Sequence, residues 1–260
     1  MRDIRIRCSS IGTIMTAPKL KSEVLSVGAK THIRQLAAQA ILGIDFVVSS
    51  KPMEKGIQCE ESAIELVRAV TGRLFTKNTE RRKNEYIIGE CDVFDEQLRE
   101  GRDIKCSWSA ATFPITVEDC ADKLYEYQMR GYMALWDAER WHVDYCLLDT
   151  PEHLIGFDPL PMHIVSHIPE HMRVTTWTVT RDLAIEAAIW DKVQHARAYY
   201  AQVLNEFDRT HQDATLLQGD PGDDTTPLPL PDMRMDDPAD MDAPWVLLTD
   251  KPEPAIDPFA

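Results

Sequence analysis

Residues 84–108 read NEYIIGECDVFDEQLREGRDIKCSW and contain two runs of strand-forming residues separated by a polar turn. The runs 85–88 and 91–94 are apolar and rich in residues that favour strands. Residues 96–101 are polar and end in glycine, which is typical of a turn, and 102–108 can return as a second strand. The whole stretch therefore predicts a β-hairpin.

The second strand of this hairpin would carry a charged pair on one face. Asp103 and Lys105 are two residues apart, so their side chains share a face, while Ile104 points to the other. Asp92, near the end of the first strand, can lie beside them. Two carboxylates and a lysine on one sheet face offer oxygen ligands for Mg²⁺ and a fixed cation. The alternative is an ordinary solvated strand face, but no other lysine in the sequence follows an acidic residue by two positions.

A further carboxylate lies on a helix predicted over 57–70, directly after Gly56. Glu60 is in register with the apolar residues of this helix, whereas Glu61 is in register with its polar residues. An acid on a buried helix face is costly unless a cation meets it. Glu60 is therefore a candidate metal ligand or partner of Lys105. A carboxylate at the edge of the apolar face is the alternative, and the choice between Glu60 and Glu61 as a ligand stays open.

The other periodic segments predict the elements that surround the hairpin. Helices are expected over 29–42, 117–138 and 181–207, and strands over 141–148 and 173–180. Gln128 and Tyr132 are four residues apart in one of these helices, so they share a face.

A short helix is also predicted near the N-terminus, ending at Met15. Ser9 or Ser10 can cap its start. A serine-led helix start flanked by arginines, the first of them Arg2, also suits a phosphate group, because free N–H groups point toward it. Simple capping is the alternative use of either serine.

The composition is that of a globular protein without a membrane segment. Hydrophobic residues make up 44% of the chain, and no apolar run approaches the ~20 residues of a membrane span. The N-terminus, MRDIRIRC, lacks the apolar stretch of a signal peptide. The six cysteines include no C-x-x-C pair, which disfavours a zinc site or a disulfide framework and favours a reducing cytoplasm.

The net charge of −15 is unevenly distributed. Residues 1–83 carry 15 Lys and Arg against 8 Asp and Glu, residues 84–207 carry 10 against 22, and residues 208–260 carry 3 against 13. A basic N-terminal third beside an acidic middle is compatible with a nucleic-acid contact next to a cation-binding centre, or with ordinary surface scatter. Residues 208–260 also contain nine of the sixteen prolines, which predicts a disordered acidic tail after a folded domain over 1–207.

This order of features resembles the YqaJ-like viral recombinase family of PD-(D/E)xK nucleases, the lambda-exonuclease-like family. The resemblance is carried by five matches in the family's order: Arg2, Ser9 and Pro18; Gly56, Glu60 and Ala63; Asp92 with the D-I-K-C run 103–106; Gln128, Tyr132 and Trp141; and residues 180–182. Two positions depart from the family pattern. Asp103 stands where the family often has Glu, and Cys91 stands where the family motif has Pro.

The resemblance implies a fold and a set of site residues. The fold would be α/β (α+β), a restriction-endonuclease-like core with a central mixed β-sheet flanked by helices. One or two Mg²⁺ ions, with Mn²⁺ able to substitute, would be held by three carboxylates and one carbonyl: Glu60, Asp92, Asp103 and the Ile104 carbonyl. Lys105 would orient the attacking water or stabilise the transition state, with support from Gln128. The groups implied to hold the 5′-phosphate or the DNA backbone are Arg2, Ser9, Ser10 and Tyr132.

The activity implied is a Mg²⁺-dependent 5′→3′ double-stranded DNA exonuclease. It would act on DNA ends and leave 3′ single strands for a single-strand annealing recombinase. The family also implies a ring of three subunits and a protein of phage or prophage origin in the bacterial cytoplasm. Two alternatives stay open: a PD-(D/E)xK endonuclease of restriction or repair type, and an inactive DNA-end-binding adaptor.

Overall fold

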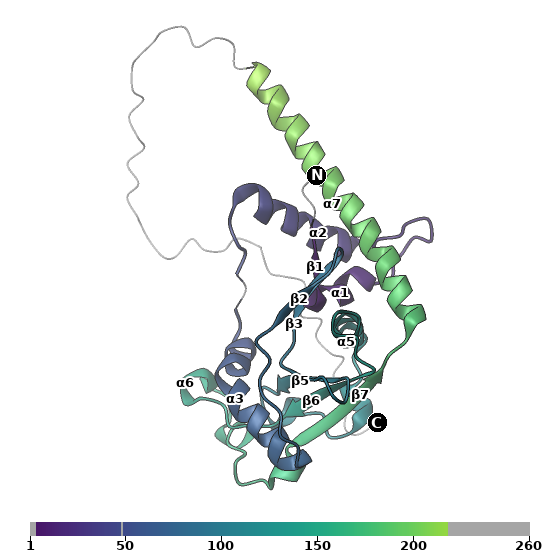
Figure 1. The fold of residues 1–260 in the computed structure, drawn as a ribbon. Coiled ribbons are helices and arrows are strands. Elements are labelled where there is room, and N and C mark those ends of the chain that lie inside the picture. Colours follow the sequence, from purple (N-terminus) through teal and green to yellow (C-terminus); the bar gives the residue numbers. More distant parts are fainter. Residues whose placement is uncertain (1–3, 48, 218–260) are drawn as a thin grey trace, which may run out of the picture. The chain divides into compact units, whose positions relative to one another are not determined.

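The computed structural model describes residues 4–47 and 49–217 of the 260. Helices and strands alternate irregularly along the chain (Figure 1). The strands are β1 (Ile6–Arg7), β2 (Arg81–Lys83), β3 (Ile87–Glu90), β4 (Val93–Asp95), β5 (Glu100–Cys106), β6 (Arg140–Cys146) and β7 (Val174–Thr180). The α-helices are α1 (Cys8–Met15), α2 (Val27–Leu42), α3 (Lys51–Thr71), α4 (Val117–Cys120), α5 (Lys123–Trp136), α6 (Glu152–Ile155) and α7 (Leu183–Leu217). Short 3₁₀ turns occupy Ala110–Thr112, Leu160–Met162 and Glu170–Met172.

The strands form two mixed sheets. The smaller sheet has the order β1-β3-β2, with β1 parallel and β2 antiparallel to β3. The larger sheet has the order β4-β5-β6-β7, in which only β5 and β6 are parallel. The mixed α/β architecture inferred from the sequence is confirmed.

The hairpin predicted over 84–108 is only partly right. β4 and β5 do form an antiparallel hairpin, with Val93 opposite Arg102. The preceding run, β3, instead pairs with β1 and β2 in the smaller sheet, so the chain passes between sheets at Cys91 and Asp92. Gly101 also lies inside β5 and not in the turn. A side chain at this position would meet the buried ring of Trp141 at 2.4 Å, so glycine is needed for close packing.

One face of the larger sheet is covered by α3. Ala63, Ile64 and Val67 of this helix pack against Ile104 and Cys146. The helix begins earlier than predicted because Ser50 caps it, accepting a hydrogen bond from the N–H of Met53. Gly56 is therefore inside the helix and not before it. The predicted end is confirmed, since Gly72 adopts a left-handed conformation with φ +66°.

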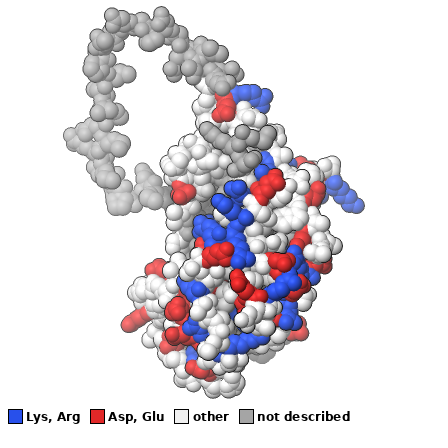
Figure 2. Space-filling view, in the orientation of Figure 1, with Lys and Arg blue, Asp and Glu red and all other residues white. Residues whose placement is uncertain are grey.

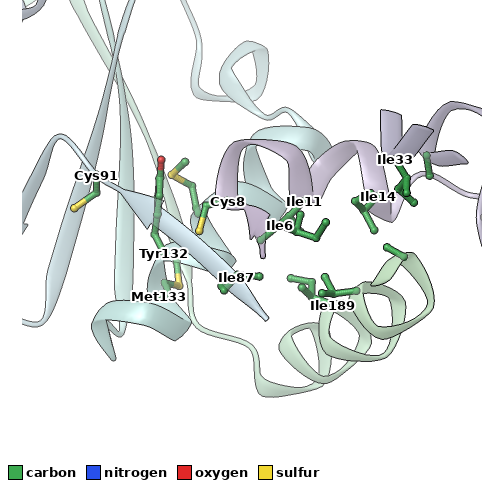
Figure 3. Packing of buried hydrophobic residues seen from close by; sticks show 14 of the residues in the cluster. Ile6, Cys8, Ile11, Ile14, Ile33, Ile87, Cys91, Tyr132, Met133 and Ile189 are labelled. Atoms are coloured by element: carbon green, nitrogen blue, oxygen red, sulfur yellow. The ribbon is translucent and has the colours of Figure 1, made fainter. Parts of the chain in front are cut away.

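The other face of the larger sheet packs against α5, and α1 packs on α5 and on the smaller sheet (Figure 1). The helix predicted over 117–138 is divided into α4 and α5, because Asp122 starts a new helix by accepting hydrogen bonds from two backbone N–H groups. Trp141 and Val143 of β6 belong to the same core as Met133 of α5. Figure 3 shows this core continuing through Ile11 of α1 toward Ile189 of α7.

The two terminal helices differ from their predictions in detail. α1 begins at Cys8, so Ser9 and Ser10 lie within its first turn, and the expected side-chain cap is absent there. α7 runs to Leu217, ten residues beyond the end expected at Phe207. The remainder of the expected acidic tail, 218–260, lies outside the described residues. Within the described part of the chain, no helix combines the length and the apolar character that crossing a membrane requires.

Candidate active site

A cavity of about 830 Å³ opens where α1, α3, α5 and the connection between β3 and β4 meet. Its lining includes four of the predicted site residues, Ser9, Glu60, Asp92 and Tyr132, and also the basic residue Arg7. These residues are up to 125 positions apart in the sequence, so only the packing of α1, α3 and α5 brings them to one place. Ser10 does not line the cavity, and Arg2 lies outside the described residues.

Asp92 lies at the point where the chain passes from one sheet to the other. Its Oδ2 accepts a hydrogen bond of 2.6 Å from the backbone N–H of Ile104, which joins the start of β4 to β5. Burial raises the pKa of Asp92 to about 7, and the neighbouring carboxylate of Asp103 adds to the increase. The positive charge of Lys105 opposes the shift without cancelling it. A site that raises a carboxyl pKa in this way favours the arrival of another cation.

Asp103 and Lys105 share the face of β5 that looks toward α5, as predicted. Lys105 Nζ lies 2.5 Å from Asp103 Oδ2, and the Asp103 side chain is only 3% exposed. The partner of the buried Asp103 Oδ2 is therefore the ammonium group of Lys105. Although burial acts to lower it, the Asp103 charge raises the pKa of Lys105 above its usual range. Lys105 is therefore a permanent cation beside the two carboxylates.

Gln128 of α5 connects this charged pair to the cavity. Its Nε2 lies 3.4 Å from Asp103 Oδ1 and donates a 3.1 Å hydrogen bond to the hydroxyl of Tyr132. The shared helix face predicted for Gln128 and Tyr132 is confirmed by this contact. Burial, followed by the charge of Asp103, raises the pKa of Tyr132, so the phenol stays protonated.

Glu60 faces the cavity from α3, while Glu61 is exposed and does not line it. The structure thus favours Glu60 over Glu61 as the helix carboxylate of the site. The partner of Glu60 is not Lys105: Lys77 Nζ lies 2.6 Å from Glu60 Oε2. The candidate pairing of Glu60 with Lys105 is therefore wrong, because Lys105 pairs with Asp103 instead.

The carboxylates of the site are potential ligands of a metal ion. No group of three or more His, Cys, Asp or Glu side chains within 4–47 and 49–217 is already arranged to hold a metal. Lysines engage two of the carboxylates, Glu60 and Asp103. The residues nevertheless fit a hard divalent cation, since Asp92 and Asp103 are close enough to interact and together offer carboxylate oxygens that one lysine does not fully neutralise. Their role as ligands, with the Ile104 carbonyl, stays a prediction.

Sequence reasoning missed the basic residues that line the cavity next to these acids, here called the basic wall. Lys77 and Arg81 line it together with Asn78. The signal was present in the run 80–83, ERRK, whose arginines and lysine form β2. Figure 2 shows Lys and Arg side chains gathered over the smaller sheet, interleaved with acidic ones. This basic wall faces the same cavity as Asp92 and Glu60.

Comparison with known proteins identifies the class to which this site belongs. No protein-family model and no curated protein sequence matches the chain. Among solved structures, it is similar to a phage-related exonuclease from Haemophilus somnus 129PT, with 35% sequence identity over 79% of this chain and 97% of that one, and a TM-score of 0.75.

Two further structures share the fold. An alkaline exonuclease from Laribacter hongkongensis is 18% identical over 82% of this chain and 94% of that one, with a TM-score of 0.59. The same exonuclease in complex with dAMP gives 20% identity and a TM-score of 0.56, with the same coverage. The chain belongs to the family of phage-related exonucleases, the YqaJ-like, lambda-exonuclease-like branch of the PD-(D/E)xK nucleases.

Proposed function

We propose that this protein is a metal-dependent deoxyribonuclease that degrades linear duplex DNA from its 5′ ends. The observation that carries the proposal is the placement of Asp92, Asp103 and Lys105 in one charge network beside a cavity that also contains Glu60. Membership of the exonuclease family supports the same reaction class. The proposal goes beyond this reaction class in two respects, the 5′→3′ direction of digestion and the dependence on a divalent metal ion.

The carboxylates Glu60, Asp92 and Asp103, with the carbonyl of Ile104, would hold Mg²⁺, and Mn²⁺ would substitute. Such an ion makes a water molecule easier to deprotonate and neutralises charge on the scissile phosphate. Lys105 supplies a permanent positive charge next to Asp103, where it can stabilise negative charge that develops on the phosphate. Gln128 of α5 donates hydrogen bonds to both Asp103 and Tyr132, so it would act by holding these two side chains in position.

The DNA end would enter the cavity on the side of α1. Ser9 and Arg7 line this side, and Arg2 precedes them in the sequence. These groups would take the 5′-phosphate, while Tyr132 contributes a hydroxyl on the cavity wall. Contacts of this kind read the backbone and not the bases, so cleavage would not depend on sequence. The 3′ single strands left behind would serve an annealing recombinase, and a ring of three subunits would keep the enzyme on its substrate.

Timed digestion of end-labelled linear duplex tests the proposal. Duplexes with and without a 5′-phosphate are compared beside a supercoiled circle, each with Mg²⁺. The proposal expects loss of label from the 5′ end, faster with the phosphate, and an intact circle. Cutting of the circle would favour the endonuclease alternative. Binding of ends without consumption in Mg²⁺ or Mn²⁺ would favour the inactive adaptor.

A further inference from the structure

Lys77 occupies a position in the site that neither the fold nor the expected mechanism explains. It lies in the segment between α3 and β2 and lines the cavity. Its Nζ is 2.6 Å from Glu60 Oε2, with the lysine side chain 44% and the glutamate side chain 31% exposed. The ammonium group of Lys77 is therefore the direct counter-charge of the Glu60 carboxylate.

The ion pair occupies a carboxylate that the proposed reaction needs for another purpose. Within the described residues, Lys77 is the partner with which Glu60 forms a hydrogen bond or ion pair. Both side chains reach solvent, and ion pairs in such positions contribute little to folding stability. A divalent cation competes well for a carboxylate oxygen, because it carries twice the charge and prefers oxygen ligands. The pair is therefore poorly explained as a structural bridge and readily opened by a metal.

The surroundings of Lys77 define where its ammonium group can act once it leaves Glu60. Arg81 and Asn78 line the same wall of the cavity, and Arg7 lies on the α1 side. They lie beside the acids of the site, since the Asn78 N–H donates to the Asp92 carbonyl, and Arg81 is paired with the exposed Glu90. A DNA strand whose phosphate lies near the carboxylates would bring its neighbouring phosphates to this wall.

We propose that Lys77 is a displaceable counter-cation, which neutralises Glu60 before metal binds and contacts a DNA phosphate after the metal has replaced it. This inference rests on the proposed function, because it assumes a divalent cation at Glu60 and a DNA substrate. It makes metal loading and DNA binding mutually supportive: the ion that occupies Glu60 also releases the group that holds the substrate.

The first measurement is Mn²⁺ binding to the DNA-free protein by isothermal titration calorimetry. Lys77→Met removes the competing ammonium, so Mn²⁺ should bind more tightly, by about fivefold or more. Tighter binding separates the proposal from simple damage, because a variant that disturbs Glu60 would bind metal more weakly. Lys83→Met is the matched control, since Lys83 is an exposed lysine on β2 that does not line the cavity. Its Mn²⁺ affinity should equal that of the wild type.

The second measurement is binding of a 5′-phosphorylated duplex in the presence of Ca²⁺, a divalent cation that binds carboxylate oxygens and would take the place of the catalytic metal. Lys77→Met should bind this DNA several-fold more weakly than the wild type and Lys83→Met. Lys77→Arg keeps a cation at the position and should restore both Mn²⁺ and DNA binding toward the wild-type values. Unchanged or weaker Mn²⁺ binding by Lys77→Met, or unchanged DNA binding, would overturn the inference. Neither measurement requires turnover, so a wild-type protein that binds both ligands but digests no DNA would contradict the proposed function alone.

Discussion

At the scale of single residues, the site is a problem of charge balance. Two carboxylates, Asp92 and Asp103, lie together in a largely buried place, and Lys105 supplies one compensating charge. The remaining imbalance is visible in the raised pKa of Asp92, about 7. A divalent cation would remove it, which is the physical reason for expecting a metal here.

Replacing Lys105 should separate catalysis from folding. Lys105→Ala removes a cation that the proposed mechanism places beside the developing phosphate charge, so digestion of linear duplex should fall at least about a hundredfold. The Lys105 side chain is 27% exposed, so water can enter the space that the truncation leaves. Timed digestion and a thermal melt check both parts. Retained activity in a folded Lys105→Ala protein would remove Lys105 from the site.

The adjacent acids of α3 provide a matched pair of variants. Glu60 lines the cavity and Glu61 does not, although one position separates them. Glu60→Ala should therefore lose most Mg²⁺-dependent digestion, while Glu61→Ala should digest DNA at close to the wild-type rate. Both rates are measured over a range of Mg²⁺ concentrations. The reverse result would mean that α3 presents a different face to the substrate.

At the scale of elements, a buried lysine fastens α3 to the larger sheet. The Lys55 side chain is fully buried, and its Nζ donates hydrogen bonds of 2.8 to 3.0 Å to the carbonyl oxygens of Ser107, Trp108 and Leu148. These carbonyls follow β5 and β6 directly, so Lys55 ties the helix that carries Glu60 to the strand that carries Asp103. Desolvation lowers the pKa of Lys55, and the three acceptors compensate its burial.

Removing this lysine should destabilise the protein strongly. Lys55→Met has a similar length but leaves the carbonyl groups of Ser107 and Leu148 without a donor, which costs about 1–3 kcal/mol for each group that water does not reach. The Trp108 carbonyl keeps a hydrogen bond from the Thr150 hydroxyl. The midpoint of thermal unfolding should fall by several degrees at least. Lys51→Met, at the exposed start of the same helix, is the control and should change the midpoint little. Equal midpoints for the two variants would show that Lys55 is not a structural tie.

At the scale of the whole molecule, the distribution of charge matters more than its total. The net charge is −15, yet the cavity has a basic wall that includes Lys77 and Arg81, and Arg7 lines the α1 side of the same cavity. A local group of basic side chains can attract a phosphate backbone even when the net charge of the chain is negative. The chain can therefore be acidic overall and still bind DNA at one place.

Binding to duplex ends should consequently weaken steeply with salt. If about four phosphates are contacted, affinity falls on the order of a hundredfold between about 50 and 200 mM salt. Fluorescence anisotropy with a labelled duplex in Ca²⁺ measures this slope, and the thermal melt at each salt concentration controls for folding. An affinity that does not depend on salt would contradict backbone binding by the basic wall.

Local features of the fold and the site were predictable from the sequence, whereas the pairing of distant elements was not. Local patterns were sufficient for the alternation of Asp103, Ile104 and Lys105, for the shared face of Gln128 and Tyr132, and for the helix stop at Gly72. They failed where distant packing decided the outcome. The runs now seen as β3 and β4 both have strand composition, and nothing local shows that they pair with different sheets.

What the sequence by itself determined is therefore the set of chemical groups and the face on which each one lies, since the periods of helix and strand are properties of the backbone. Tertiary structure alone decided which charges meet. Lys77, and not Lys105, pairs with Glu60 because the segment after α3 lines the same cavity as Glu60. Lys55 is buried because the segments that follow β5 and β6 meet at its ammonium group. Contacts between residues far apart in the chain depend on how elements pack, which no local spacing encodes.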